Sequence, residues 1–332
     1  METLRRSYLA ASRSVFLVFT VLVLMSCAAG QHRDSQHPMG HHNSPAGSAP
    51  SEIQEWAKAK LAKSSRHREW VKVKNGNREV SSFVVYPEVK NKATAVIVIH
   101  EINGMTDWVQ SLTDQLAEAG YIAIAPDLLS GMGPNGGGTT DVATVGSNAV
   151  GVAIRELPPD QITGDLKAVA DYVGKLPSAN GKVVVAGFCW GGGQSFRYAT
   201  NNAGLRAAFV FYGPPPMNKD QTIDKAALSR IAAPVYGFYA ENDSRINATL
   251  PATVEAMKEL KKKFDPATYE GAGHGFMRAG EAPEPQAPPS KDNEEADKVA
   301  AETYQKALAA YKANKKARDE AWKRWKKILA AI

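Results

Sequence analysis

Cysteine is scarce in this chain of 332 residues, which holds only Cys27 and Cys189. Cys27 lies in an apparent targeting segment, so the mature body would contain one thiol and no internal disulfide. No ATP-type phosphate loop is present, and no spacing of His, Cys, Asp and Glu matches a metal site, so we expect neither a cofactor nor a metal. The apolar run at residues 15–25 has eleven residues, which is too short to span a bilayer comfortably.

Residues 1–27 carry the features of a bacterial export signal. Positive charges stand near the apolar run, which ends in Leu24-Met25-Ser26-Cys27. This ending resembles a lipobox, in which the cysteine is lipidated and becomes the first mature residue. Ordinary cleavage near Ala29 is the alternative, because Met25 stands where a small residue is usual. We therefore expect export to the periplasm or cell envelope, with a lipid on Cys27 that attaches the protein to the membrane.

Residues 28–50 predict a flexible tether, because a segment rich in His, Pro, Gly and Ser cannot bury a core. Its histidines lie close together, but no carboxylate or thiol pattern accompanies them. A tether is therefore favoured over a metal site.

Residues 51–313 predict one α/β domain, in a chain whose 44% hydrophobic content is typical of globular proteins. Strands are predicted at 69–73, 80–86, 95–100, 121–127, 183–188, 207–212 and 235–240, and helices at 107–119 and 163–176. Alternating strands and helices are typical of an open, mostly parallel sheet flanked by helices. In such sheets the chemistry lies beyond the carboxyl ends of the strands.

The segment Gly187-Phe188-Cys189-Trp190-Gly191 is the most informative motif. It follows an apolar strand and precedes a segment compatible with a helix, which is the arrangement of the nucleophile turn of α/β-hydrolases. Glycines flank the nucleophile because side chains there would clash in so tight a turn. With Cys189 in the usual place of serine, the nucleophile would be a thiolate. The alternative is a buried, inert thiol.

Two downstream residues complete a catalytic pattern. Asp243 follows the strand at 235–240, and His274 lies in Gly273-His274-Gly275. Nucleophile, acid and histidine in this order are typical of the fold. Cysteine would attack a carbonyl, histidine would move the proton, and aspartate would orient the imidazole. Either residue alone would be read as an ordinary loop residue.

The cysteine turn, the strand end His100-Glu101-Ile102-Asn103-Gly104 and the segment His274-Gly275-Phe276 resemble the dienelactone hydrolase family. The resemblance covers about residues 70–313 and implies an α/β-hydrolase fold with a triad of Cys189, Asp243 and His274.

The resemblance also implies roles for neighbouring residues. Glu101 would contact the thiol in the resting enzyme and help to deprotonate it when substrate binds. The backbone N–H groups of Ile102 and Trp190 would form the oxyanion hole, which agrees with the geometry expected of the fold.

An arginine four residues after the histidine, here Arg278, would bind a substrate carboxylate; the alternative is a solvated surface arginine. A second family arginine has no counterpart, because Gly146-Ser147-Asn148 stands there and Arg155 does not align. The resemblance therefore implies an ester or lactone substrate rather than a named dienelactone.

Two further segments carry recognisable patterns. Gly131-x-Gly133-x-x-Gly136 fits a dinucleotide-binding pattern, but the residues after it do not predict a helix, so a loop is favoured. A helical pattern runs from Asp292 to the end of the chain, and its residues 314–332 are predicted to form a basic helical extension. Its lysines and aromatic residues would suit an anionic membrane or nucleic acid, but a helix docked on the body with a solvated basic face is favoured, and no nucleic acid is expected.

We predict an exported hydrolase that cleaves a small carboxylic ester or lactone through an acyl-enzyme on Cys189. Two alternatives stay open from sequence. One is a non-catalytic, surface-attached binding protein of the same fold. The other is a thioester or peptide hydrolase that uses the same triad, because pocket shape sets the substrate.

Overall fold

The computed structural model describes residues 50–290 and 292–332. The predicted export signal, with Cys27, and the tether up to residue 49 lie outside the described residues. Export and lipid attachment therefore stay predictions from sequence.

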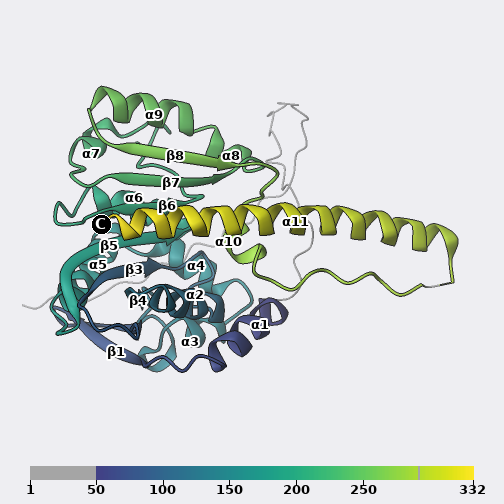
Figure 1. Ribbon diagram of the computed structural model, residues 1–332, viewed down its shortest axis with the longest axis horizontal. Helices are drawn as coiled ribbons and strands as arrows, with labels where there is room; N and C mark the ends of the chain where they lie inside the picture. The colour runs from purple at the N-terminus through teal and green to yellow at the C-terminus, as the bar shows by residue number, and fades with distance from the viewer. Residues whose placement is uncertain (1–49, 291) are drawn as a thin grey trace, which may run out of the picture. The chain divides into compact units, whose positions relative to one another are not determined.

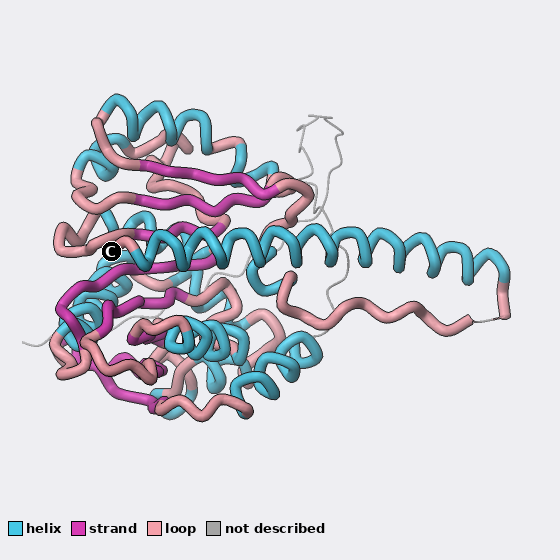
Figure 2. Tube along the Cα trace, viewed as in Figure 1, coloured by secondary structure: helices cyan, strands magenta, loops and turns pink. Residues whose placement is uncertain are grey.

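The described chain is built on one eight-stranded sheet with the strand order β1-β2-β4-β3-β5-β6-β7-β8 (Figures 1 and 2). The strands are β1 (Arg68–Asn75), β2 (Arg78–Val85), β3 (Ala93–Ile99), β4 (Ile122–Pro126), β5 (Ala179–Phe188), β6 (Ala208–Phe211), β7 (Val235–Ala240) and β8 (Phe264–Tyr269). The β1–β2 and β2–β4 pairs are antiparallel, and every other pair is parallel. The predicted mostly parallel sheet is confirmed.

The central strands are buried on both faces. In β3, Ile97 and Ile99 belong to one hydrophobic cluster, whereas Val96 and Val98 belong to the other. This follows from the alternation of side chains along a strand, and it explains why β3 is a continuous apolar run in sequence.

Helices cover both faces of the sheet. They are α1 (Pro50–Ala62), α2 (Asp107–Glu118), α3 (Thr139–Ala143), α4 (Ala149–Glu156), α5 (Pro159–Gly174), α6 (Trp190–Ala199), α7 (Lys225–Ser229), α8 (Ser244–Asn247), α9 (Leu250–Glu259), α10 (Phe276–Ala279) and α11 (Glu294–Ala330), with a 3-10 turn at Pro134–Gly136. Buried side chains of α5, α6 and α9 join one cluster, and those of α2, α10 and α11 join the other.

The strand β8 was not predicted from sequence. It contains Asp265 and Pro266, which disfavour strands, but it lies at the edge of the sheet, where proline is tolerated. The carboxyl end of β8 leads to the loop that carries His274.

The helix predicted from Asp292 to the end of the chain is present as α11, one helix of 37 residues, so the predicted domain boundary between residues 313 and 314 falls inside a helix. On the C-terminal side, Ala317, Ala321, Trp325 and Leu329 recur every four residues and are buried against the sheet. The segment 314–332 is therefore part of the helical layer over the sheet (Figure 1). The favoured prediction of a docked helix with an exposed basic face is confirmed, since Lys323, Lys326 and Lys327 are exposed.

The glycine-rich segment also differs from expectation, because the short helix α3 begins at Thr139. The Asp127 carboxylate holds this start, accepting from the Thr139 N–H and hydroxyl at 2.7 Å each. The Gly138 N–H donates to Asp141 at 3.1 Å. The glycine pattern carries no sign of these side-chain hydrogen bonds, so the sequence did not predict the helix.

Candidate active site

Cys189 lies in the sharp turn between β5 and α6, with φ +56° and ψ −117°. Residues other than glycine rarely adopt this conformation. A Cβ on Gly187 would lie 1.9 Å from the carbonyl oxygen of Gly191, and one on Gly191 would lie 2.3 Å from that of His100. Both glycines are therefore required for the close backbone approach that presents the sulfur.

Cys189, Asp243 and His274 come together from three separate loops. Asp243 follows β7, and His274 lies between β8 and α10. The Cys189 Sγ is 3.0 Å from His274 Nε2, and His274 Nδ1 is 2.5 Å from Asp243 Oδ2. Asp243 is buried, whereas the thiol is partly exposed. A molecule from solvent can therefore reach the sulfur at one end of this hydrogen-bonded chain.

The surroundings of His274 favour its charged form. Burial lowers the pKa of the imidazole, but hydrogen bonds to Asp243 and Cys189 and the charges on both outweigh burial and raise the pKa of His274 to about 10. At neutral pH the ring is then an imidazolium, with Nδ1–H donating to Asp243 and Nε2–H donating to the sulfur.

Glu101 lies after β3 beside this group, but its partners differ from those expected. Arg278 Nε donates to Glu101 Oε2 at 2.8 Å, and the Tyr212 hydroxyl donates to Oε1 at 3.3 Å. Among the hydrogen bonds of residues 50–290 and 292–332, the sulfur of Cys189 pairs with His274 and not with Glu101. The expected resting contact between Glu101 and the thiol is thus corrected. A buried carboxylate needs a cation, and Arg278 supplies it.

Arg278 lies beside this group and is not a solvated surface arginine, which was the alternative that the sequence left open. Its side chain is 24% exposed, and the carboxylate of Glu101 raises its pKa. Arg155 is exposed on α4, where its Nη1 donates to the carbonyl of Gly151 at 3.0 Å.

Tyr212 is a site residue that sequence reasoning missed. It is buried with φ +40°, its hydroxyl meets Glu101, and its ring lies edge-on to the ring of His274 with centroids 5.1 Å apart. Burial and then the charge of Glu101 raise the pKa of Tyr212. In sequence it is only the last aromatic residue of an apolar run, so nothing marked it.

The two predicted oxyanion donors, the N–H groups of Trp190 and Ile102, stand at the start of α6 and after β3. Trp190 is the first residue of α6, where an N–H has no acceptor within the helix. Ile102 lies in the turn after β3. His100 supports both segments: its ring stacks on Trp190 with centroids 5.5 Å apart, and its Nδ1–H donates to the carbonyl of Glu101 at 2.9 Å. Burial lowers the pKa of His100, in keeping with a neutral ring whose Nε2 accepts from the backbone.

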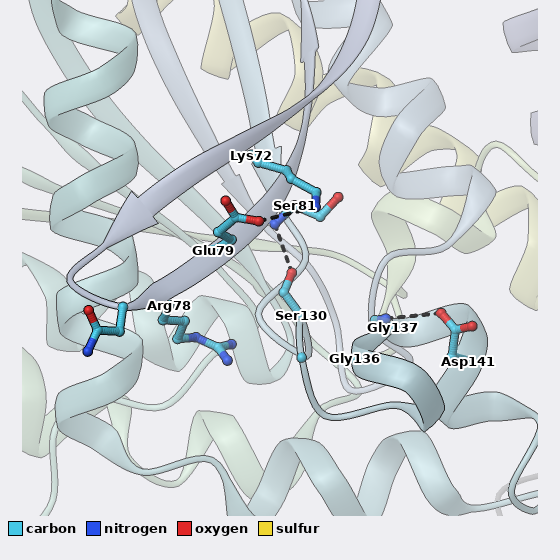
Figure 3. Close-up of a pocket in the computed structure, with 11 residues that line it drawn as sticks. Lys72, Arg78, Glu79, Ser81, Ser130, Gly136, Gly137 and Asp141 are labelled. Atoms are coloured by element: carbon cyan, nitrogen blue, oxygen red, sulfur yellow. Dashed lines mark hydrogen bonds and ion pairs between the residues drawn. The ribbon is translucent and has the colours of Figure 1, made fainter.

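A separate polar pocket of about 840 Å³ opens between the β1–β2 hairpin and the glycine-rich loop (Figure 3). None of the predicted site residues lines it. Its basic side chains are already paired, Lys72 with Glu79 at 3.1 Å and Arg78 with Asp165 at 2.9 Å. The N–H groups of Gly136 and Gly137 are used within the loop. These paired side chains and backbone groups are therefore not free to hold a phosphate.

Within the described ranges, no group of three or more His, Cys, Asp and Glu side chains could hold a metal ion. The same residues contain no helix with both the length and the apolar character needed to cross a membrane.

The family model described as "Dienelactone hydrolase family" matches residues 80–332, so the match includes α11. Curated relatives carry the name "Putative carboxymethylenebutenolidase". The relative from Escherichia coli (strain K12) is 31% identical over 186 residues, which are 54% of this chain and 66% of the relative. The relative from Saccharolobus solfataricus is 30% identical over 233 residues, covering 60% of this chain and 84% of the relative. The chain thus spans about two thirds of the length of the first relative and more of the second.

Solved structures agree on the fold. A structure named "Putative Dienelactone Hydrolase" from Klebsiella pneumoniae has a TM-score of 0.55 and 22% identity, over 75% of this chain and 100% of that one. A dienelactone hydrolase-like promiscuous phosphotriesterase from metagenomic libraries has a TM-score of 0.52 and 18% identity, over 74% of this chain and 98% of that one. With a family match over most of the chain and the same sheet and helices, this chain belongs to the dienelactone hydrolase family of ester and lactone hydrolases.

Proposed function

We propose that this chain hydrolyses a carboxylic ester or lactone, with Cys189 as the nucleophile and a covalent acyl-enzyme as the intermediate. The observation that carries the proposal is the hydrogen-bonded chain from Cys189 Sγ through His274 to Asp243, with contacts of 3.0 and 2.5 Å. A thiolate, an acid–base and an orienting carboxylate are the parts that acyl transfer needs.

In the first half-reaction the sulfur of Cys189 attacks the substrate carbonyl and forms a C–S bond. The carbonyl π electrons move to oxygen, and the N–H groups of Ile102 and Trp190 stabilise the resulting oxyanion. As the C–O bond breaks, the His274 imidazolium gives its Nε2 proton to the leaving alkoxide. With a lactone, the leaving hydroxyl stays attached to the acyl group.

In the second half-reaction the now neutral His274 takes a proton from water, which attacks the thioester. The C–S bond breaks, the carboxylic acid leaves, and the imidazolium–thiolate pair is restored. Asp243 holds Nδ1–H throughout, so that Nε2 faces the sulfur.

Arg278 is proposed as the contact for a substrate that carries a carboxylate. Its Nε–H donates to Glu101, and the guanidinium has further N–H donors that suit a substrate carboxylate. The name of the curated relatives denotes hydrolysis of a lactone with such an acidic substituent, which supports this substrate class. Glu101 is proposed to hold Arg278 and Tyr212 in place rather than to deprotonate the resting thiol.

The test is Cys189→Ala, assayed on p-nitrophenyl acetate and a panel of small lactones with reducing agent present. Loss of a catalytic nucleophile is expected to lower kcat by at least about a thousandfold. Cys27→Ala is the matched control, because it removes the other cysteine of the sequence and should leave turnover unchanged. Unchanged turnover in Cys189→Ala would remove the proposal.

The acyl-enzyme is tested separately with a slowly hydrolysed ester. Mass spectrometry of the quenched reaction should find the acyl group on the peptide containing Cys189, and His274→Gln should prolong its lifetime. Acylation at another residue would contradict the mechanism. Lipid attachment at Cys27 stays a proposal, tested by loss of the lipid mass and of membrane association in Cys27→Ala.

A further inference from the structure

The loop that carries His274 is held by α11, a helix that lies well beyond it in the sequence. The Gly273 N–H, next to the histidine, donates to Asn314 Oδ1 at 2.8 Å across 41 residues. Asn314 is part-buried on the turn of α11 that faces the loop. This is a side-chain contact to the backbone immediately before the catalytic ring.

The same turn of α11 contacts the chain on the other side of His274. A Cβ on Gly280, at the end of α10, would lie 2.5 Å from the carbonyl oxygen of Asn314 and 2.7 Å from Cβ of Arg318. The backbone after the histidine therefore packs directly on α11. His274 lies between two points of attachment to one helical turn.

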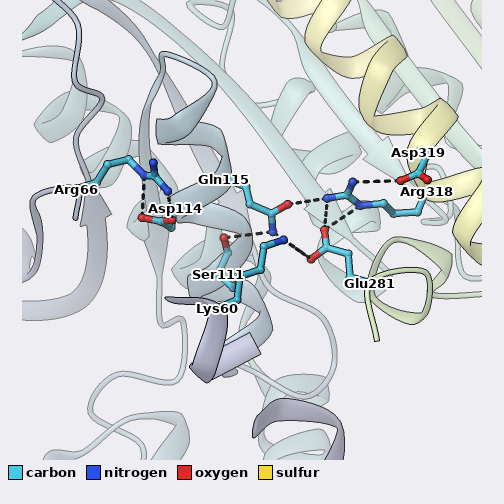
Figure 4. Close-up of polar contacts among 8 residues, drawn as sticks. All are labelled: Lys60, Arg66, Ser111, Asp114, Gln115, Glu281, Arg318 and Asp319. Carbon is cyan, nitrogen blue, oxygen red and sulfur yellow. Dashed lines mark hydrogen bonds and ion pairs between the residues drawn. The ribbon is translucent and has the colours of Figure 1, made fainter. Parts of the chain in front are cut away.

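Arg318 strengthens the second attachment (Figure 4). Its guanidinium binds Glu281, which follows α10, with a contact from Nε at 2.9 Å, and it also donates to Gln115 of α2 at 2.6 Å. Glu281 is 5% exposed, and Lys60 of α1 approaches it at 3.5 Å. Ion pairs that are desolvated and hydrogen-bonded on several sides fix geometry more firmly than exposed pairs do.

We infer that Asn314 and Arg318 are positioning residues for His274, which hold the imidazole where Nε2 reaches the sulfur. Neither touches the reacting atoms. The inference rests on the proposed function, because it assigns the geometry of the same triad to a turn of α11. A positioning role has a measurable consequence, since a displacement of a catalytic group by about 1 Å can lower the reaction rate about a hundredfold.

The experiment compares Asn314→Leu with Asn314→Asp. Leucine has a similar size but no acceptor for the Gly273 N–H, whereas aspartate keeps an oxygen of the same reach. We expect Asn314→Leu to lower kcat by roughly 10- to 100-fold with KM within about threefold, and Asn314→Asp to recover most of the rate. Lys315→Ala is the control, because that side chain is exposed and loses only its pair with Asp319.

A second readout does not depend on turnover. The pH profile of Cys189 alkylation by iodoacetamide reports whether the imidazolium lies beside the sulfur. In Asn314→Leu the profile should move to higher pH, and in Asn314→Asp and Lys315→Ala it should match the wild type. A folded Asn314→Leu variant with wild-type kcat and alkylation profile would overturn the inference.

The two proposals fail in different ways. Undiminished ester hydrolysis by Cys189→Ala would contradict the proposed function. The alkylation profiles would then still test whether Asn314 positions His274 beside the sulfur. Thermal unfolding verifies the fold of each variant. If Asn314→Leu does not fold, Asn314→Ala replaces it without added bulk, and loss of the fold in both would assign Asn314 to the fold rather than to the histidine.

Discussion

The turn that carries Cys189 and the loop that carries His274 reach the same site by different physical routes. The cysteine turn is shaped by Gly187 and Gly191, which lie within five residues and permit backbone contacts that no side chain would allow. The histidine loop is held by Asn314, 41 residues after Gly273. A geometry fixed by neighbours in sequence is visible as a motif, whereas a geometry fixed by a distant helix is not.

The largest effect is expected from a substitution that disrupts the turn carrying Cys189. In Gly187→Ala the new Cβ would meet the backbone oxygen of Gly191 at 1.9 Å, and backbone cannot rotate away. We expect a loss of at least about 3 kcal/mol in the free energy of unfolding, the upper end of overpacking costs, together with loss of hydrolysis. Denaturant unfolding and the ester assay measure both.

The matched substitution in the histidine loop is Gly273→Ala. There the Cβ would lie 3.8 Å from Asn314 Oδ1, an ordinary contact. Stability should stay within about 1 kcal/mol of the wild type. Equal losses at positions 187 and 273 would contradict the contrast between the two segments.

A loss of stability of similar size is expected from Trp325→Ala, which tests whether α11 supports the site from beneath the sheet strands. Trp325 is fully buried and packs against Phe188, the residue before the thiol, and against Phe211, with centroids 5.9 and 4.9 Å apart. Truncation of a buried tryptophan costs about 3–5 kcal/mol.

The control for Trp325→Ala is Trp70→Ala on the edge strand β1. Its side chain is 48% exposed, so its truncation should cost less than about 1 kcal/mol. A small cost at Trp325, measured by denaturant unfolding, would show that the C-terminal half of α11 is an appendage after all.

The contrast explains what could be predicted from sequence. Gly187, Cys189 and Gly191 form a local pattern, and the order of Cys189, Asp243 and His274 follows the order of the strands, so these three side chains could be expected at one place before any coordinates. Glu101 could be placed near the thiol, but its partner could not, because Arg278 and Tyr212 reach it from distant segments. Asn314 has no sequence signal, since an asparagine on a helix is ordinary.

The predicted boundary between residues 313 and 314 follows the net positive charge at the end of the chain, whereas the predicted helix continues through it. Ala317, Ala321, Trp325 and Leu329 mark a buried helical face at a spacing of four residues. Charge describes the exposed side of a helix and apolar spacing the buried side, so the apolar spacing is the better guide to domain limits.

The smallest expected effect is the dependence of stability on pH. In the folded chain the pKa of His274 is raised from 6.5 to about 10, so the folded state binds this proton more tightly than the unfolded state does. The resulting stabilisation is complete below about pH 6.5, declines as the pH rises, and is lost above about 10. The effect is modest, because the side chain is 34% exposed and water screens the pair with Asp243.

The difference in Tm between the wild type and His274→Gln, measured from pH 6 to 10.5, should therefore narrow with rising pH. His67→Gln, which removes a histidine whose side chain is 71% exposed, should show no such narrowing between pH 8 and 10.5. A difference that instead widens with pH would mean that His274 is neutral in the folded chain. The thiol would then keep its proton in the resting state, and the proposed imidazolium–thiolate pair would form only during catalysis.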